Sequence, residues 1–111
     1  MGSQLSTKMK DHLLIGWTTV GSAEVAQKLA CELVESGLAA CVQIDREISS
    51  VYQWEGHVCQ EREWRLQVKF LESKSEALLE WIDRAHPYST PEWVVVTPTQ
   101  VAAKYDDWVR R

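Results

Sequence analysis

Three cysteines and one histidine are the side chains best suited to hold a soft metal ion. Cys41 lies between alanines on a predicted strand, Cys59 lies beyond a hairpin turn, and Cys31 lies on a predicted helix. Thiolate and imidazole are the ligands that Cu(I) prefers, so we take His86 and Cys41 as candidate metal ligands. Free cysteine is also among the most buried residue types, and burial is the competing interpretation for Cys31 and Cys41. For His86, which precedes a proline, the competing role is capping of a helix end.

A second set of residues combines aromatic rings with charges of both signs. These candidates for a cleft between subunits are Tyr52, Trp54, Glu61, Glu63, Lys69, Tyr88 and Glu92. If the hairpin of one subunit reaches the loop after His86 in its neighbour, the two surfaces form an apolar cleft with a few polar groups, which is typical of a ligand site. The same residue types also anchor subunit interfaces, so both interpretations stay open.

No arrangement of residues typical of catalysis is found. The sequence has no recognisable nucleophile and base pair, no glycine-rich phosphate loop and no HExxH motif. We therefore predict that the protein is not an enzyme.

The composition suits one globular domain in a reducing compartment. We assign residues 12–111 to that domain and expect the polar segment 1–11 to be disordered. The net charge of −4 argues against a nucleic-acid partner, since phosphate binding needs clustered lysine and arginine. No apolar run is long enough to cross a membrane, and an odd number of cysteines without CxxC spacing favours the cytoplasm.

Residues 39–71 are predicted to form a long hairpin that organises the rest of the chain. Apolar and polar residues alternate along both arms, which is typical of strands with one buried face. A three-residue loop at 55–57 would place Trp54 opposite Val58 and Val42 opposite Phe70, and a bulge or bend is expected near 45–47.

Helical and strand patterns flank this hairpin on both sides. Ser22 is positioned to cap a helix that ends near Gly37, and the sequence from Ser73 to Glu76 has the form of a capping box. The predicted elements are a strand at 12–19, a helix at 22–37, the two arms of the hairpin, a helix at 73–86, a strand at 92–97 and a short helix at 101–108.

This order, β-α-β-β-α-β with a C-terminal helix, predicts an α+β fold of the ferredoxin-like sandwich type. Both crossover helices then cover one face of an antiparallel sheet. The other face lacks helices although the first and last strands are apolar on both sides, and the long hairpin at 39–71, between the second and third strands, overshoots its partners. We therefore expect a closed homo-oligomer.

Four motifs resemble the CutA family of divalent cation tolerance proteins. They lie at 38–42 (LAACV), 50–56 (SVYQWEG), 86–92 (HPYSTPE) and 105–108 (YDDW). The resemblance implies a ferredoxin-like homotrimer, joined through strand edges, with copper or another divalent cation as its ligand and a role in metal homeostasis. It also implies an architecture like that of the PII signalling proteins, so a PII-like small-ligand module and a scaffold without a ligand are the alternatives.

The chain departs from the family pattern at two places. Arg46 and Glu47 stand where members usually have Pro-Gly, so the bend in that strand must arise differently. Thr18 and Ala85 stand where members linked to copper offer a cysteine and a second histidine. Of that set only His86 remains.

Overall fold

A computed structural model of the protein describes residues 10–111, which form one body of 56 × 28 × 26 Å. The elements in chain order are β1 (Leu13–Val20), α2 (Ala23–Glu35), β2 (Cys41–Ile44), β3 (Ile48–Trp54), β4 (His57–Leu71), a 3₁₀ turn (Glu72–Lys74), α3 (Ser75–Ala85), β5 (Val94–Val96) and α4 (Ala103–Val109). Of the segment 1–11 predicted to be disordered, residues 1–9 lie outside the described part. Asp11 is held in place, because the backbone N–H and the hydroxyl of Ser73 donate to its carboxylate at 2.8 and 2.6 Å.

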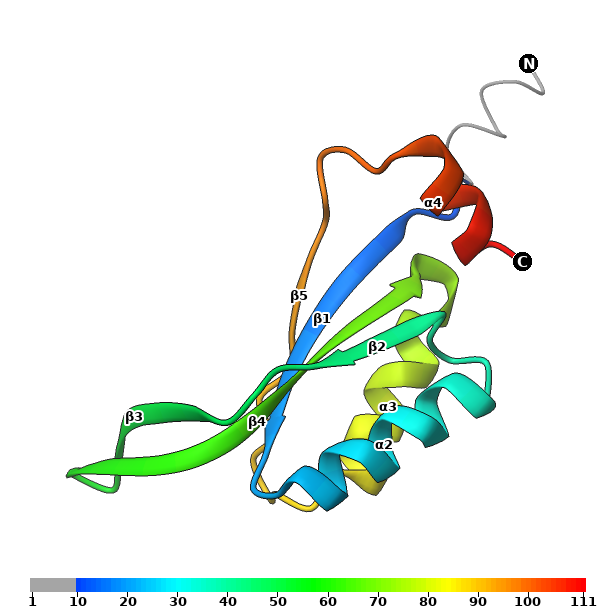
Figure 1. Ribbon diagram of the computed structural model, residues 1–111. Helices are drawn as coiled ribbons and strands as arrows, with labels where there is room; N and C mark the ends of the chain where they lie inside the picture. The colour runs from blue at the N-terminus through cyan, green and yellow to red at the C-terminus, as the bar shows by residue number, and fades with distance from the viewer. Residues whose placement is uncertain (1–9) are drawn as a thin grey trace.

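The α+β class with an antiparallel sheet is confirmed. The strands lie in the order β2-β4-β1-β5, every pair is antiparallel, and β3 pairs with the outer half of β4. Figure 1 shows α2 and α3 side by side on one face of the sheet, while β3 and the start of β4 project well beyond the helices. The fold therefore carries a long two-stranded arm on a helix-covered body.

Local signals set the ends of α2 as predicted. The Ser22 hydroxyl accepts a hydrogen bond from the Val25 N–H at 3.1 Å, and Gly37 has φ = 79°, the left-handed conformation expected just beyond the helix. The prediction of a capping box at 73–76 was wrong. Ser73 bonds Asp11 instead, the chain first makes the 3₁₀ turn, and α3 starts after Lys74 without a side-chain cap.

The core lies between the two helices and the sheet. Its largest fully buried side chains include Phe70, Leu33, Leu78 and Ile82. Trp93 enters this core beside Gly16, where a Cβ atom would come within 2.3 Å of the indole. Phe70 packs against the same indole, with 5.9 Å between the ring centroids. Gly16 is thus required because it leaves room for Trp93.

The predicted register of the hairpin was wrong. Trp54 pairs with His57 rather than Val58, and Val42 pairs with Val68 rather than Phe70. The loop has two residues, Glu55 and Gly56, with φ = 49° and 80°. Such turns with two positive φ values match the twist of the paired strands. In the exposed arm no buried face enforces the apolar alternation, so the turn sets the register.

The bend predicted near 45–47 is confirmed. Between the pairs Ile44–Leu66 and Ile48–Glu63, one strand advances four residues while β4 advances three, so one extra residue is accommodated. Asp45 fixes this bulge. Its backbone N–H donates to the Arg65 carbonyl at 2.8 Å, and its carboxylate accepts from Arg65 Nε at 2.7 Å.

The face of the sheet opposite α2 and α3 is covered only at one end. There α4 contributes buried Val109, and Lys69 Nζ lies 5.3 Å from the centroid of the Tyr105 ring. Elsewhere, large apolar side chains are exposed on β5 and on the arm, including Val94 at 49% and Val58 at 73%. Among the described residues, no helix is long and apolar enough to cross a membrane.

Candidate ligand groove

A groove of about 890 Å³ runs between the β3–β4 arm and the loop that follows α3. Strand pairing places the side chains of Tyr52 and Cys59 together, and those of Ser50 and Glu61 together, on the same face of the arm. The loop closes the other side. The groove residues are Thr19, Ser50, Val51, Tyr52, Trp54, Cys59, Glu61, Glu63, Tyr88, Ser89, Thr90, Pro91 and Glu92.

Two hydrogen bonds between phenols and carboxylates organise the groove. The Tyr88 hydroxyl donates to Glu63 Oε2 at 2.9 Å and so ties the loop to β4. Burial, the hydrogen bond to Glu63 and the negative charge of that carboxylate raise the pKa of Tyr88, which keeps the phenol a donor. On the arm, the Tyr52 hydroxyl donates to Glu61.

His86 holds the loop from behind. Its Nδ1 accepts the Tyr88 backbone N–H at 3.1 Å, so the proton of the neutral ring lies on Nε2. Nε2 is 3.0 Å from both the Thr19 carbonyl and the Thr18 hydroxyl on β1. Burial lowers the pKa of His86, which favours this neutral ring. His86 is the C-cap residue of α3, where its backbone N–H donates to the Ile82 carbonyl at 3.1 Å. The ring itself bonds β1 rather than the last carbonyls of the helix, so this part of the capping interpretation was wrong.

The two candidate metal ligands lie on opposite faces of the sheet. Cys41 is paired across the sheet with Lys69, and Lys69 with Ile15. Paired residues point to the same face, and these three point to the face without α2 and α3. His86 instead bonds Thr18, whose side chain points toward the helices as the pairing alternates along β1. Both ring nitrogens of His86 are occupied by protein hydrogen bonds. Within residues 10–111, no three His, Cys, Asp or Glu side chains gather closely enough to hold a metal ion.

The groove unites six of the seven residues proposed for the cleft, and it does so within one chain. Lys69 is the exception, because it lies beside Tyr105 at the other end of the sheet. Sequence reasoning did not place Thr19 or Ser50 in the groove. The pairing of Ser50 with Glu61 would have indicated the latter, had the register been known. The expected burial of Cys31 was wrong, because Cys31 is exposed on α2 beside Gln27.

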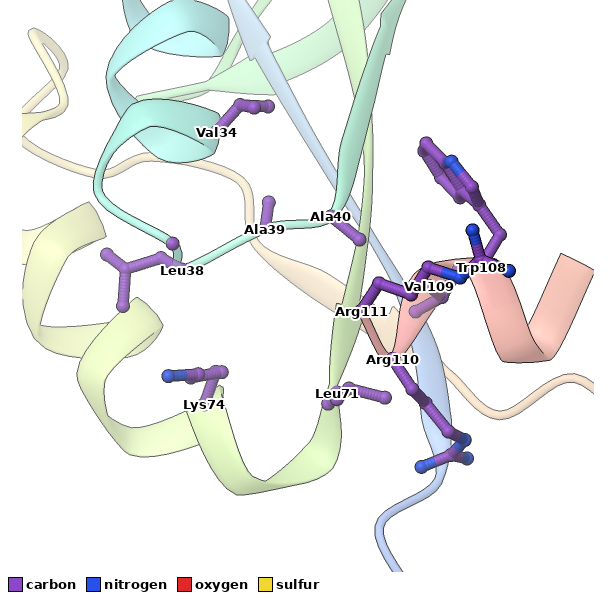
Figure 2. Close-up of a pocket in the computed structure, with 11 residues that line it drawn as sticks. Val34, Leu38, Ala39, Ala40, Leu71, Lys74, Trp108, Val109, Arg110 and Arg111 are labelled. Carbon is purple, nitrogen blue, oxygen red and sulfur yellow. The ribbon is translucent and has the colours of Figure 1, made fainter.

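A second hollow, of about 500 Å³, lies between the end of α2, the chain from 37 to 40 and α4. Its basic residues are Lys74, Arg110 and Arg111. Figure 2 shows the side chains of Lys74 and Arg110 pointing away from one another, and Arg110 is already paired with Asp106. These charges do not converge on one ligand, which leaves the groove as the better site.

Comparison with known families agrees with the motifs that line the groove. The sequence model of the CutA1 divalent ion tolerance protein family matches residues 14–111, which is nearly the whole chain. The chain belongs to the CutA1 family. A relative from Thermus thermophilus, named divalent-cation tolerance protein CutA, is 40% identical over 102 residues, covering 92% of this chain and 96% of that protein. The chloroplastic CutA protein of Arabidopsis thaliana is 37% identical over 97 residues, 87% of this chain but only 53% of its own length.

Solved CutA structures share the fold. The structure of CutA from Synechococcus elongatus has a TM-score of 0.85 and 41% sequence identity, with coverage of 90% of this chain and 88% of that one. CutA1 from Thermus thermophilus has a TM-score of 0.83 and 37% identity, covering 87% and 94%. The fold described above is therefore shared with solved CutA chains over 87% to 90% of this chain. The family is named for tolerance to divalent ions and not for an enzymatic reaction.

Proposed function

We propose that this CutA1 protein is a cytoplasmic homotrimer of ferredoxin-like chains that binds divalent cations, copper among them, in support of metal tolerance. The observation that supports this most is the charge of the groove, which contains Glu61, Glu63 and Glu92 but no lysine, arginine or histidine. Carboxylates are suitable ligands for hard and borderline divalent cations. The same charge disfavours a PII-like site for an organic anion near Lys69 and Tyr88.

Association between chains is supported by the surface that a single chain leaves uncovered. β2 and β5 are the edge strands of the sheet, β5 exposes Val95 at 41%, and the arm exposes Val58 at 73%. Open edges and apolar side chains of this size favour pairing with another chain, and a closed ring is the usual symmetric outcome. In a trimer a neighbour can supply the further ligands that a metal ion needs in the groove.

Titration of the assembled protein with Zn²⁺ and Mn²⁺ tests the groove. We expect the variant with both Glu61→Gln and Glu63→Gln to bind at least about tenfold more weakly than wild type, because two anionic ligands are lost. Glu80→Gln, an exposed change on α3, is the matched control. Equal binding by the double variant and wild type would remove the groove from the proposal.

His86 and Cys41 remain proposed ligands for copper, now in a site that draws on more than one chain. Binding at His86 requires the ring to release either the Tyr88 N–H or the Thr19 carbonyl. The affinity for Cu(I) and Cu(II), measured by titration, should therefore be lower in Cys41→Ser and His86→Ala than in wild type if these residues bind the metal. Unchanged binding in both variants would exclude them.

A further inference from the structure

The carboxylates of the groove lack positive partners within the described chain. The ion pairs there join Arg62 to Glu47, Arg65 to Asp45 and Arg110 to Asp106, and none of them involves a groove residue. Three negative charges in one hollow repel each other unless a cation balances them. The groove therefore carries a negative charge that a bound cation would balance.

Glu63 is the carboxylate best placed to pair with a cation inside the groove. The residue is only 8% exposed, yet its carboxylate has a single hydrogen bond, from the Tyr88 hydroxyl to Oε2. Oε1 accepts no hydrogen bond from any described residue. Every fully buried side-chain oxygen of the described residues has a hydrogen-bond partner, so Oε1, which has none, must be accessible to solvent. Glu63 lines the groove, so a donor placed there can reach this oxygen.

Aromatic rings accompany the carboxylates along the groove. Trp54 is 52% exposed and Tyr52 is 37% exposed, while Tyr88 forms part of the opposite wall. The phenol hydroxyls of both tyrosines are engaged with Glu61 and Glu63, which holds these rings in place beside the charges. Indole and phenol faces attract organic cations, which are less strongly hydrated than small metal ions.

The spacing of the charges within one chain also suits an elongated ligand. Within residues 10–111, no three carboxylates converge as a chelating group, although three of them line the same groove. Its volume of about 890 Å³ lies within the range of pockets for small organic molecules. We propose that the groove binds an organic diamine or polyamine, whose ammonium groups pair with Glu63 and its neighbours while its alkyl chain lies against Trp54 and Tyr88.

This inference rests on the groove that we propose as the cation site and extends the ligand class from metal ions to organic cations. Putrescine and Mg²⁺ carry the same charge, so their comparison separates organic recognition from simple charge attraction. Calorimetric titration of the full chain with each, at one ionic strength, is the direct experiment. n-Butylamine, with one ammonium group, tests whether two charges are needed.

We expect putrescine to bind more tightly than both Mg²⁺ and n-butylamine. Glu63→Gln should weaken putrescine binding at least about tenfold, the usual effect of losing a charge-assisted hydrogen bond. Trp54→Leu should weaken it between about two- and thirty-fold and leave Mg²⁺ binding unchanged. Glu80→Gln should have no effect. Circular dichroism of each variant checks that the fold is retained.

The inference is overturned if putrescine does not bind, if it binds no better than Mg²⁺, or if Glu63→Gln and Trp54→Leu leave its affinity unchanged. Its failure is distinguishable from failure of the proposed function. Zn²⁺ binding at the groove without putrescine binding would contradict only the organic ligand. Putrescine binding without Zn²⁺ or Mn²⁺ binding would contradict only the metal function.

Discussion

His86 connects three parts of the chain through the two nitrogens of one ring. It bonds β1 at Thr18 and Thr19, it terminates α3, and it accepts the N–H of Tyr88, whose hydroxyl holds Glu63. The groove wall therefore depends on a neutral imidazole. Burial lowers the pKa of this ring and outweighs the hydrogen bond to the Thr19 carbonyl and the negative charge of Glu63, which both raise it.

Stability should consequently depend on pH through His86. Its pKa in the folded chain is below the ordinary value of 6.5, so the unfolded chain binds the proton first as the pH falls. The contribution is fully present above about pH 6.5 and is lost as the pH falls through the folded-state pKa. Urea unfolding at pH 7.5 and pH 5 measures this loss, which we expect to be smaller in His86→Gln. An equal loss in wild type and variant would contradict the assignment.

Gly16 offers a second prediction about a single residue. Gly16→Ala should destabilise the protein by about 1–3 kcal/mol, because the new Cβ overlaps the Trp93 indole in a packed core. Gly21→Ala is the matched control, since its Cβ would meet only the Tyr88 hydroxyl at 3.4 Å. Thermal unfolding of both variants at one protein concentration compares them. Similar melting temperatures would show that Trp93 can move without cost.

Among the elements, the β3–β4 arm was the hardest to predict from the sequence. The stripe of Ala26, Leu29, Ala30 and Leu33 and the Ser22 cap predicted α2, because helix periodicity and capping are local. The register of the arm depended instead on Glu55 adopting a positive φ, which its residue type does not favour. The predicted register was inferred from a buried apolar face, and few side chains of the arm are buried in a single chain.

The same contrast applies to the groove residues. Their chemistry was visible in the sequence, since Tyr88 and Glu92 share one loop motif and Tyr52 and Trp54 share another. The sequence did not show that they meet within one chain, because this depends on the position of Glu63 along β4, next to Tyr88 of the loop. The partners of His86, Thr18 and Thr19, are more than sixty residues away and give no local signal.

The turn of the arm yields a prediction for this element. Glu55→Asn should raise the stability by about 0.5–1 kcal/mol, because asparagine tolerates positive φ better than glutamate and Asn-Gly suits this turn. Glu55→Gln removes the same charge without that tolerance and should leave the melting temperature nearly unchanged. Equal melting temperatures for the two variants would contradict the turn assignment.

For the whole molecule, the uncovered surfaces matter most. Val94 and Val95 on β5 and Val58 on the arm are exposed in the single chain, on a sheet with two open edges. Burying such side chains against a second copy is favourable by roughly 25 cal/mol per Å² of apolar area removed from water. We therefore expect assembly, not the isolated chain, to be the state in which the groove works.

Light scattering coupled to size-exclusion chromatography at low micromolar concentration tests this expectation most directly. We predict a particle of three times the 12.7 kDa chain mass that persists on dilution. A well-folded particle of 12.7 kDa at those concentrations would contradict it, and with it the metal sites shared between chains.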